Sequence, residues 1–214
     1  VLIIVSGIFV MLSSSKYLKI NKIFKIEYPI LLLSSILGMF IMISSNDLMV
    51  FYLGLELQSL ALYVLASFKR NDQLSSESGL KYFVLSALSS GLLLYGCSLI
   101  YGFSGSTNFD QISNNISEVQ YGLTLGIVFI LVGLAFKISA VPFHMWAPDV
   151  YQGSPTSVTI FFAILPKIAA LSVFIRFLYV PFINLIDQWQ TIIIFVSIAS
   201  MVFGAVAAIG QKNL

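Results

Sequence analysis

Apolar runs of roughly twenty residues follow one another along almost the whole sequence, and they limit the possible folds more than any other feature. A helix needs about 20 apolar residues to cross the hydrocarbon core of a bilayer. A water-soluble domain carries about a quarter charged residues, whereas this chain of 214 residues is 9% charged and 58% hydrophobic. The sequence therefore predicts an all-α integral membrane protein.

About seven membrane-spanning helices are expected from the lengths of the apolar runs and from their flanking breakers. They cover about residues 1–14, 28–45, 48–68, 78–102, 121–142, 154–179 and 188–209. The fifth is expected to be broken around Pro142, and Ser154 and Pro155 are expected to start the sixth. The first run lacks the basic flank and cleavage pattern of a signal peptide. We interpret it as the end of a span whose beginning lies outside this sequence.

The charges in the loops predict the orientation of the chain. If the helices alternate in direction, one side collects Lys16, Lys19, Lys22, Lys25, Lys69, Arg70 and Lys212. The opposite side collects Asp47, Asp110, Glu118 and Asp187. By the positive-inside rule, the lysine-rich side faces the cytoplasm or the matrix.

Several classes of function find no support in the sequence. A net charge of +2 without a basic run is too small for a nucleic-acid partner. Phosphate-binding loops, zinc motifs and haem-ligating histidine pairs are absent, so no cofactor or metal is expected. The single cysteine, Cys97, lies inside an apolar run and is interpreted as a small core residue.

Three charged residues lie too deep in the predicted spans to reach water. Lys81 and Arg176 are near predicted helix ends and are expected to snorkel to the headgroups. By contrast, Glu56 and Lys167 lie roughly 12 and 18 Å from the nearer helix start, and Lys137 lies deep in the fifth span. Each costs about 2.5–3.5 kcal/mol at mid-membrane. Such residues must face protein or water and find partners.

Two interpretations of these three charges are open. In the first, Glu56 and a lysine form a structural ion pair that staples helices together. In the second, the three form a proton relay, because one carboxylate cannot fully pair two ammonium groups, and a lysine that depends on a moving carboxylate can bind and release a proton. Pro142 and Pro166 lie close to the two lysines, and broken helices are how transporters build ion sites at mid-depth. This favours the relay.

The segment 142–151 is too polar to span a membrane and contains aromatic residues, His144 and Asp149. One interpretation is an aromatic belt at the membrane interface. The other is a half-helix packed against the broken span, with His144 as a proton donor or acceptor near neutral pH.

Residues 52–60, 77–83 and 136–156 closely resemble the antiporter-like subunit 2 of proton-pumping NADH:ubiquinone oxidoreductase, respiratory complex I. The resemblance extends over nearly the whole chain and is closest to the mitochondrial type; chloroplast relatives and Mrp antiporters share it more loosely. It implies one repeat of the antiporter-like fold and a component of a proton-translocating NADH:ubiquinone reductase, with no redox centre on this chain. It also implies that Glu56 pairs with Lys137 on the broken helix, and that Lys167 on the following helix continues a half-channel. His144 belongs to the same motif.

The resemblance also implies a division of the chain and a set of partners. Residues 1–27 would form a partial helix and basic linker, 28–180 the first antiporter-like repeat, and 181–214 the start of the next. The expected partners are the lipid bilayer and other membrane-arm subunits of complex I, including antiporter-like neighbours. A separate chain carrying the second half is a further candidate, because the second repeat lies outside this sequence.

Two other functions stay open on the sequence alone, namely a subunit of a monovalent cation/proton antiporter and a non-pumping structural scaffold. The expected location is the mitochondrial inner membrane, with a bacterial plasma membrane as the runner-up.

Overall fold

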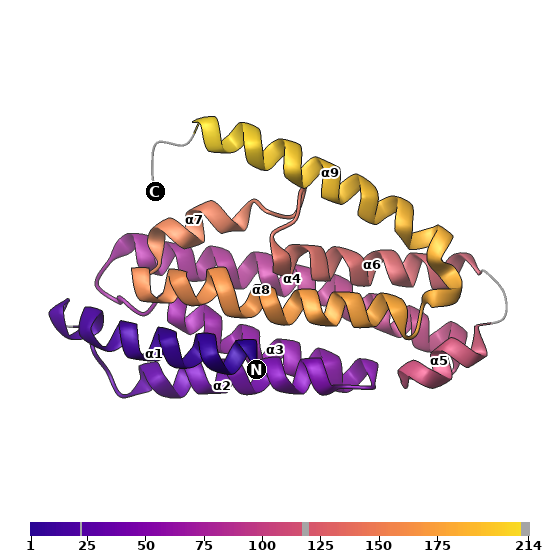
Figure 1. The fold of residues 1–214 in the computed structure, drawn as a ribbon, viewed down its shortest axis with the longest axis horizontal. Helices are drawn as coiled ribbons and strands as arrows, with labels where there is room; N and C mark the ends of the chain where they lie inside the picture. Colours follow the sequence, from indigo (N-terminus) through magenta and orange to yellow (C-terminus); the bar gives the residue numbers. More distant parts are fainter. Residues whose placement is uncertain (22, 117–119, 211–214) are drawn as a thin grey trace.

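The computed structural model describes residues 1–21, 23–116 and 120–210, and within these ranges the chain is a bundle of helices without strands (Figure 1). Seven helices are long and apolar enough to cross a membrane, which confirms the expected number of spans. The long helices are α1 (Leu2–Ile20), α2 (Glu27–Ser44), α3 (Leu48–Ala66), α4 (Gln73–Ser104), α6 (Tyr121–Ile138), α8 (Thr156–Tyr179) and α9 (Ile186–Gly210). The short elements are α5 (Phe109–Asn115), α7 (Trp146–Gly153) and the 3₁₀ turn η1 (Ile183–Leu185).

Two helices extend beyond the apolar runs that predicted them. Helix α1 continues to Ile20, so Lys16 and Lys19 belong to its last turns and not to a linker. Helix α4 begins at Gln73, because the Asp72 carboxylate accepts a hydrogen bond from the Leu74 N–H and starts the helix there. The expectation that Lys81 lies in the first turn was therefore wrong. Hydropathy marks only the apolar part of a helix, and polar residues can extend the helix beyond that part at either end.

The end of α8 was predicted correctly, but its start was not. Ser154 and Pro155 were expected to begin the helix, whereas the Ser154 hydroxyl caps nothing in the described chain and Pro155 lies just before the first helical residue. The polar stretch before α6 contains helix α5, which the Asn108 side chain caps. Lys22, Glu118 and Lys212, which entered the orientation argument, lie outside the described residues.

Close backbone approaches organise the bundle into pairs of neighbouring helices. Helices α2 and α3 pack along their length, and a Cβ atom built on Gly38 or Gly54 would meet backbone of the other helix at 2.5 or 2.6 Å. Helices α4 and α6 also pack against each other, and their backbones approach closely at Gly96 and Gly126. Small residues at crossings let membrane helices gain packing that the lipid cannot replace.

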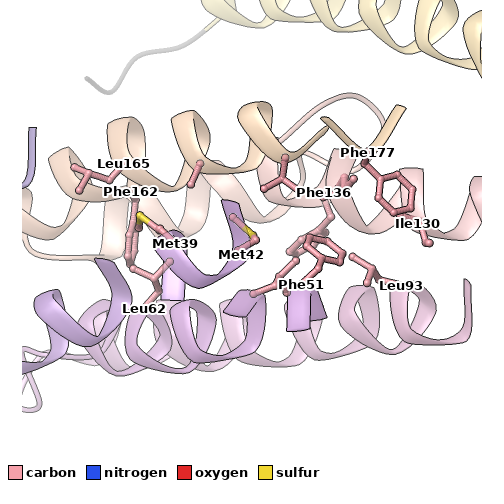
Figure 2. Close-up of a cluster of buried hydrophobic side chains, with 14 of the residues drawn as sticks. Met39, Met42, Phe51, Leu62, Leu93, Ile130, Phe136, Phe162, Leu165 and Phe177 are labelled. Atoms are coloured by element: carbon pink, nitrogen blue, oxygen red, sulfur yellow. The ribbon is translucent and has the colours of Figure 1, made fainter. Parts of the chain in front are cut away.

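The core lies where α8 crosses over these pairs. Helix α8 contacts α1, α2, α3, α6 and α7. Figure 2 shows apolar side chains filling the layer beneath α8, among them Met39, Met42, Phe51, Leu62, Phe136, Phe162, Leu165 and Phe177. This tight packing fixes the faces that α3, α4 and α6 turn toward one another.

Helix α9 is placed differently from the others. It crosses the bundle obliquely, and its C-terminal half diverges from the other helices (Figure 1). Trp189 is the residue of α9 that is buried, and its indole N–H donates to the Phe182 carbonyl at 2.9 Å. The rest of α9 presents an apolar surface.

Candidate functional site

The fifth predicted span is broken near the middle of the bundle (Figure 1). Helix α6 ends at Ile138, and Ser139 adopts a left-handed conformation with φ 60°. The residue before a proline avoids the helical region, which explains why the chain leaves the helix before Pro142. The Val141 N–H donates to the Ser200 hydroxyl of α9 at 2.9 Å, so this helix braces the break. The expected break is confirmed.

Residues 146–151 of the segment 142–151 lie in the short helix α7, which packs against the broken span as one of the two interpretations expected. Its Trp146 stacks on Phe136 of α6 and on Tyr82 of α4, and its indole N–H donates to the Phe136 carbonyl at 3.0 Å. Asp149 accepts from the Lys81 ammonium at 2.7 Å. Thus α7 is held to the broken span and to α4 by both stacking and charge.

The two cations expected to snorkel, Lys81 and Arg176, have partners within the protein. Lys81 pairs with Asp149 and also with Glu77, at 2.8 Å. The Arg176 guanidinium donates to the Ile43 carbonyl at 2.6 Å, and so satisfies a free carbonyl at the end of α2. Both residues are therefore structural ties between helices.

Lys137 lies at the end of α6, and its side chain enters the bundle. It is 7% exposed. Its ammonium donates to the hydroxyls of Ser59 on α3 and Ser86 on α4, each at 2.7 Å. The Tyr63 hydroxyl also donates to Ser86, at 2.7 Å. A buried ammonium at the broken helix is thus held by neutral groups from two neighbouring helices.

Within the described residues Glu56 forms no ion pair with a lysine, in contrast to the expected pair. None of the ion pairs within the described ranges includes Glu56, and its buried Oε1 atom has no hydrogen-bond partner there. Glu56 and Ser59 are three residues apart on α3, which places them on the same face with a rise of roughly 4.5 Å between them. The carboxyl group therefore neighbours the lysine site along the helix without occupying it.

Lys167 lies about halfway along α8, directly after Pro166, and is half-buried. Its ammonium is 5.5 Å from the centre of the Tyr151 ring, within the range of a cation–π interaction. It also lines a cavity of about 480 Å³ between α6, α8 and α9. Most of its lining is apolar, and Lys167, Ser139, Ser197 and Ser200 are the residues that bring polar side chains to it.

The same cavity reaches the break in α6. Ile138, Ser139 and Ala140 line it together with Lys167, and hydroxyls of Ser197 and Ser200 on α9 face it. The fold thus brings Lys167 and the broken backbone to one space, whereas the Lys137 side chain leaves the break toward α3 and α4.

His144 lies between the break and α7. Its ring is 4.4 Å from the ring of Phe203 on α9, and its buried Nδ1 atom has no hydrogen-bond partner in the part of the chain that the structure describes. It forms no hydrogen bond with Glu56, Lys137 or Lys167 among these residues. The structure therefore does not join His144 to the other three predicted residues.

The two hydroxyl partners of Lys137, Ser59 and Ser86, and Tyr63, which donates to Ser86, were missed by the sequence analysis. The sequence did contain a pattern that includes Ser59 and Tyr63. Ser59 and Tyr63 follow Glu56 at the third and seventh positions, which is one face of a helix. Helix α4 likewise buries a stripe of small residues that includes Ser86. Such stripes also simply pack helices, so the pattern by itself selects no partner.

A multi-pass membrane protein with a broken helix and lysines at mid-depth has the architecture of an antiporter-like transport subunit. Residues 45–214 match the family model described as "NADH:quinone oxidoreductase/Mrp antiporter, TM". The chain belongs to this family.

Relatives of known name are similar over the whole chain. It is 77% identical over 214 residues to NADH-quinone oxidoreductase subunit N of Pelagibacter ubique, covering 100% of this chain and 45% of that protein. It is 55% identical over 216 residues to the subunit of the same name from Rhodospirillum rubrum, covering 100% and 44%. The chain thus spans a little under half the length of these relatives.

Solved structures give the same picture. A chain of respiratory complex I from Thermus thermophilus superposes with a TM-score of 0.77 at 36% identity, over 89% of this chain and 41% of that one. A chain of the Mrp complex from Dietzia superposes with a TM-score of 0.79 at 27% identity, over 86% and 35%. The relatives and structures named here are bacterial, so the expected mitochondrial type is not supported.

Proposed function

We propose that this chain is part of an N-type membrane subunit of NADH-quinone oxidoreductase and translocates protons while redox chemistry proceeds in other subunits. The observation that carries the proposal is 77% identity to a subunit N along the full chain. The buried lysine at the broken helix adds a physical reason, because burying an ammonium inside a membrane bundle costs free energy and such residues usually mark ion pathways.

In this proposal Lys137 is the central proton carrier, Glu56 is its acidic neighbour on α3, and Lys167 receives or supplies the proton on the cavity side. The cavity places Lys167 and the break in one space, with three serines among its lining. Proton transfer between Lys137 and this cavity requires Lys137 to leave its hydroxyl partners. His144 is proposed as a further member of the relay beside the break, where its Nδ1 atom has no hydrogen-bond partner in the described chain.

The proposed setting follows from the relatives. Since the named relatives are bacterial, we propose a bacterial plasma membrane. The proposed partners are other membrane-arm subunits, with the lipid bilayer around them. The two units at 28–180 and 181–214 are proposed as the first repeat and the start of the second.

The second candidate function is a subunit of a monovalent cation/proton antiporter. The superposition on a chain of the Mrp complex favours it. The same lysines would then exchange protons against another cation. Proton movement that requires NADH oxidation separates the first candidate from the second.

The test is Lys137→Ala in the assembled complex, with Lys69→Ala as the matched control, since Lys69 lies in the loop before α4 and pairs only with a nearby aspartate in the described chain. NADH oxidation and proton uptake are measured together in inverted membrane vesicles. We expect Lys137→Ala to lower the number of protons moved per NADH while the control leaves it unchanged. An unchanged ratio in Lys137→Ala would reject the proposal and favour a structural scaffold.

A further inference from the structure

The partners of Lys137 are all electrically neutral. The ammonium donates to Ser59 and Ser86, and both serines are fully buried. Tyr63 donates to the same Ser86 oxygen from the other side. The Ser59 hydroxyl is itself fixed, because it donates to the Leu55 carbonyl at 2.7 Å. We call Ser59, Ser86 and Tyr63 the hydroxyl cradle.

Helix α3 presents the acidic residue and two members of the cradle along a single stripe. Glu56, Ser59 and Tyr63 are spaced by three and four residues, so their side chains follow one another at rises of roughly 4.5 and 6 Å. Lys137 occupies the Ser59 level of this stripe. The Glu56 carboxyl lies one turn earlier, with its buried Oε1 atom unpaired within the described residues.

We propose that Ser59 and Ser86 are positioning residues that hold the Lys137 ammonium at the Ser59 level of α3, close to Glu56 but out of ion-pair contact with it, so that the carboxyl–ammonium pair is open in this state. The inference rests on the proposed function, since it assigns these serines a task within the proton relay. A shift of the ammonium from the serines toward Glu56 would close the pair.

Neutral acceptors suit such a task. A direct buried ion pair is costly to open, because each charge loses its partner in a medium of low dielectric constant. Hydroxyls give the ammonium short hydrogen bonds without an opposing charge. The lysine can therefore rest at the cradle and still leave it for Glu56 or for the cavity.

The test uses Ser59→Ala and Ser86→Ala, separately and together, in the assembled complex, with Ser59→Thr and Ser86→Thr as hydroxyl-retaining variants. Ser89→Ala and Ser90→Ala are the matched controls, because these serines are buried on α4 and their hydroxyls have no partner in the described chain. Proton uptake per NADH and its rate are measured per assembled complex in inverted vesicles.

We expect each single alanine variant to move protons about tenfold more slowly, the effect of losing one hydrogen bond to a charged group, and the double variant, which loses both bonds, to be slower still. The threonine variants and the controls should stay close to the unchanged protein. A purely structural role predicts the reverse order of effects, with threonine more harmful than alanine, because alanine nearly matches serine in size and threonine adds a methyl group.

Two results would overturn the inference. The first is unchanged proton uptake in the alanine variants while Lys137→Ala abolishes it, which leaves the proposed function intact. The second is an equal loss in the alanine and threonine variants, which would mean that volume and not the hydroxyl matters. Unchanged uptake in Lys137→Ala itself would overturn the proposed function, and the inference with it.

Discussion

The close crossing of α2 and α3 provides a sharp test of the fold, because it sets the position of the helix that carries Glu56 and Ser59. The change is Gly54→Ala. A Cβ atom on Gly54 would lie 2.6 Å from the Met42 nitrogen and 3.0 Å from the Gly38 oxygen, whereas ordinary contacts begin at 3.4 Å. The helices must therefore separate by about 0.8 Å at this point, since backbone atoms cannot rotate away as a side chain can.

Such overpacking costs about 1–3 kcal/mol. Gly91→Ala is the matched control, because Gly91 lies inside α4 with nothing within 4 Å of the added Cβ atom. The control gains the helix propensity of alanine, about 1 kcal/mol, without a collision. At about 2–4 °C per kcal/mol for a chain of this size, Gly54→Ala should unfold about 2–12 °C below the control.

Cys97 provides the assay. It is the only cysteine in the sequence and is 2% exposed in the fold. A maleimide dye in detergent therefore reacts with it when the bundle opens, and the temperature midpoint of labelling reports unfolding. If Gly54→Ala unfolds at the same temperature as Gly91→Ala or above it, the two helices do not cross as closely as described.

Two further predictions concern charges at the lysine-rich end. Lys81→Met removes the ammonium that ties Asp149 of α7 to α4. Because both groups are partly exposed, we expect the free energy of unfolding to fall by about 1 kcal/mol or less, and by less still in high salt. A larger loss of stability that salt does not change would contradict this. The Lys69 ammonium, which donates to Asp72 at 2.6 Å, lowers the pKa of that carboxyl below its usual range. A lowered pKa stabilises the fold above the unfolded value of about 3.9 and is lost as the pH falls through the folded value. Asp72→Asn, whose amide oxygen can still cap the helix, should therefore lower the thermal midpoint at pH 7 and lower it less at pH 3, as followed by circular dichroism. An equal effect at both values would refute the charge argument.

The sequence predicted the number of spans and the break near Pro142, both of which the structure confirms. The mid-membrane depth of Glu56, Lys137 and Lys167 stays a prediction. These follow from local properties, since the length of an apolar run fixes whether it can cross a bilayer. The cost of a buried charge likewise depends on its depth before any partner is known. Helix bounds were less certain, because polar residues extend α1 and α4 beyond their apolar runs.

The partners of the deep charges were decided by the tertiary structure alone. The expected pair between Glu56 and a lysine is absent from the described part of the chain, and Lys137 binds Ser59 and Ser86 instead. These serines are 78 and 51 residues away from the lysine. The register in which α3, α4 and α6 pack selects which side chains meet at the break. Hydropathy therefore predicted that three charges need partners inside the membrane, and helix packing determined that hydroxyl groups bind one of them, Lys137.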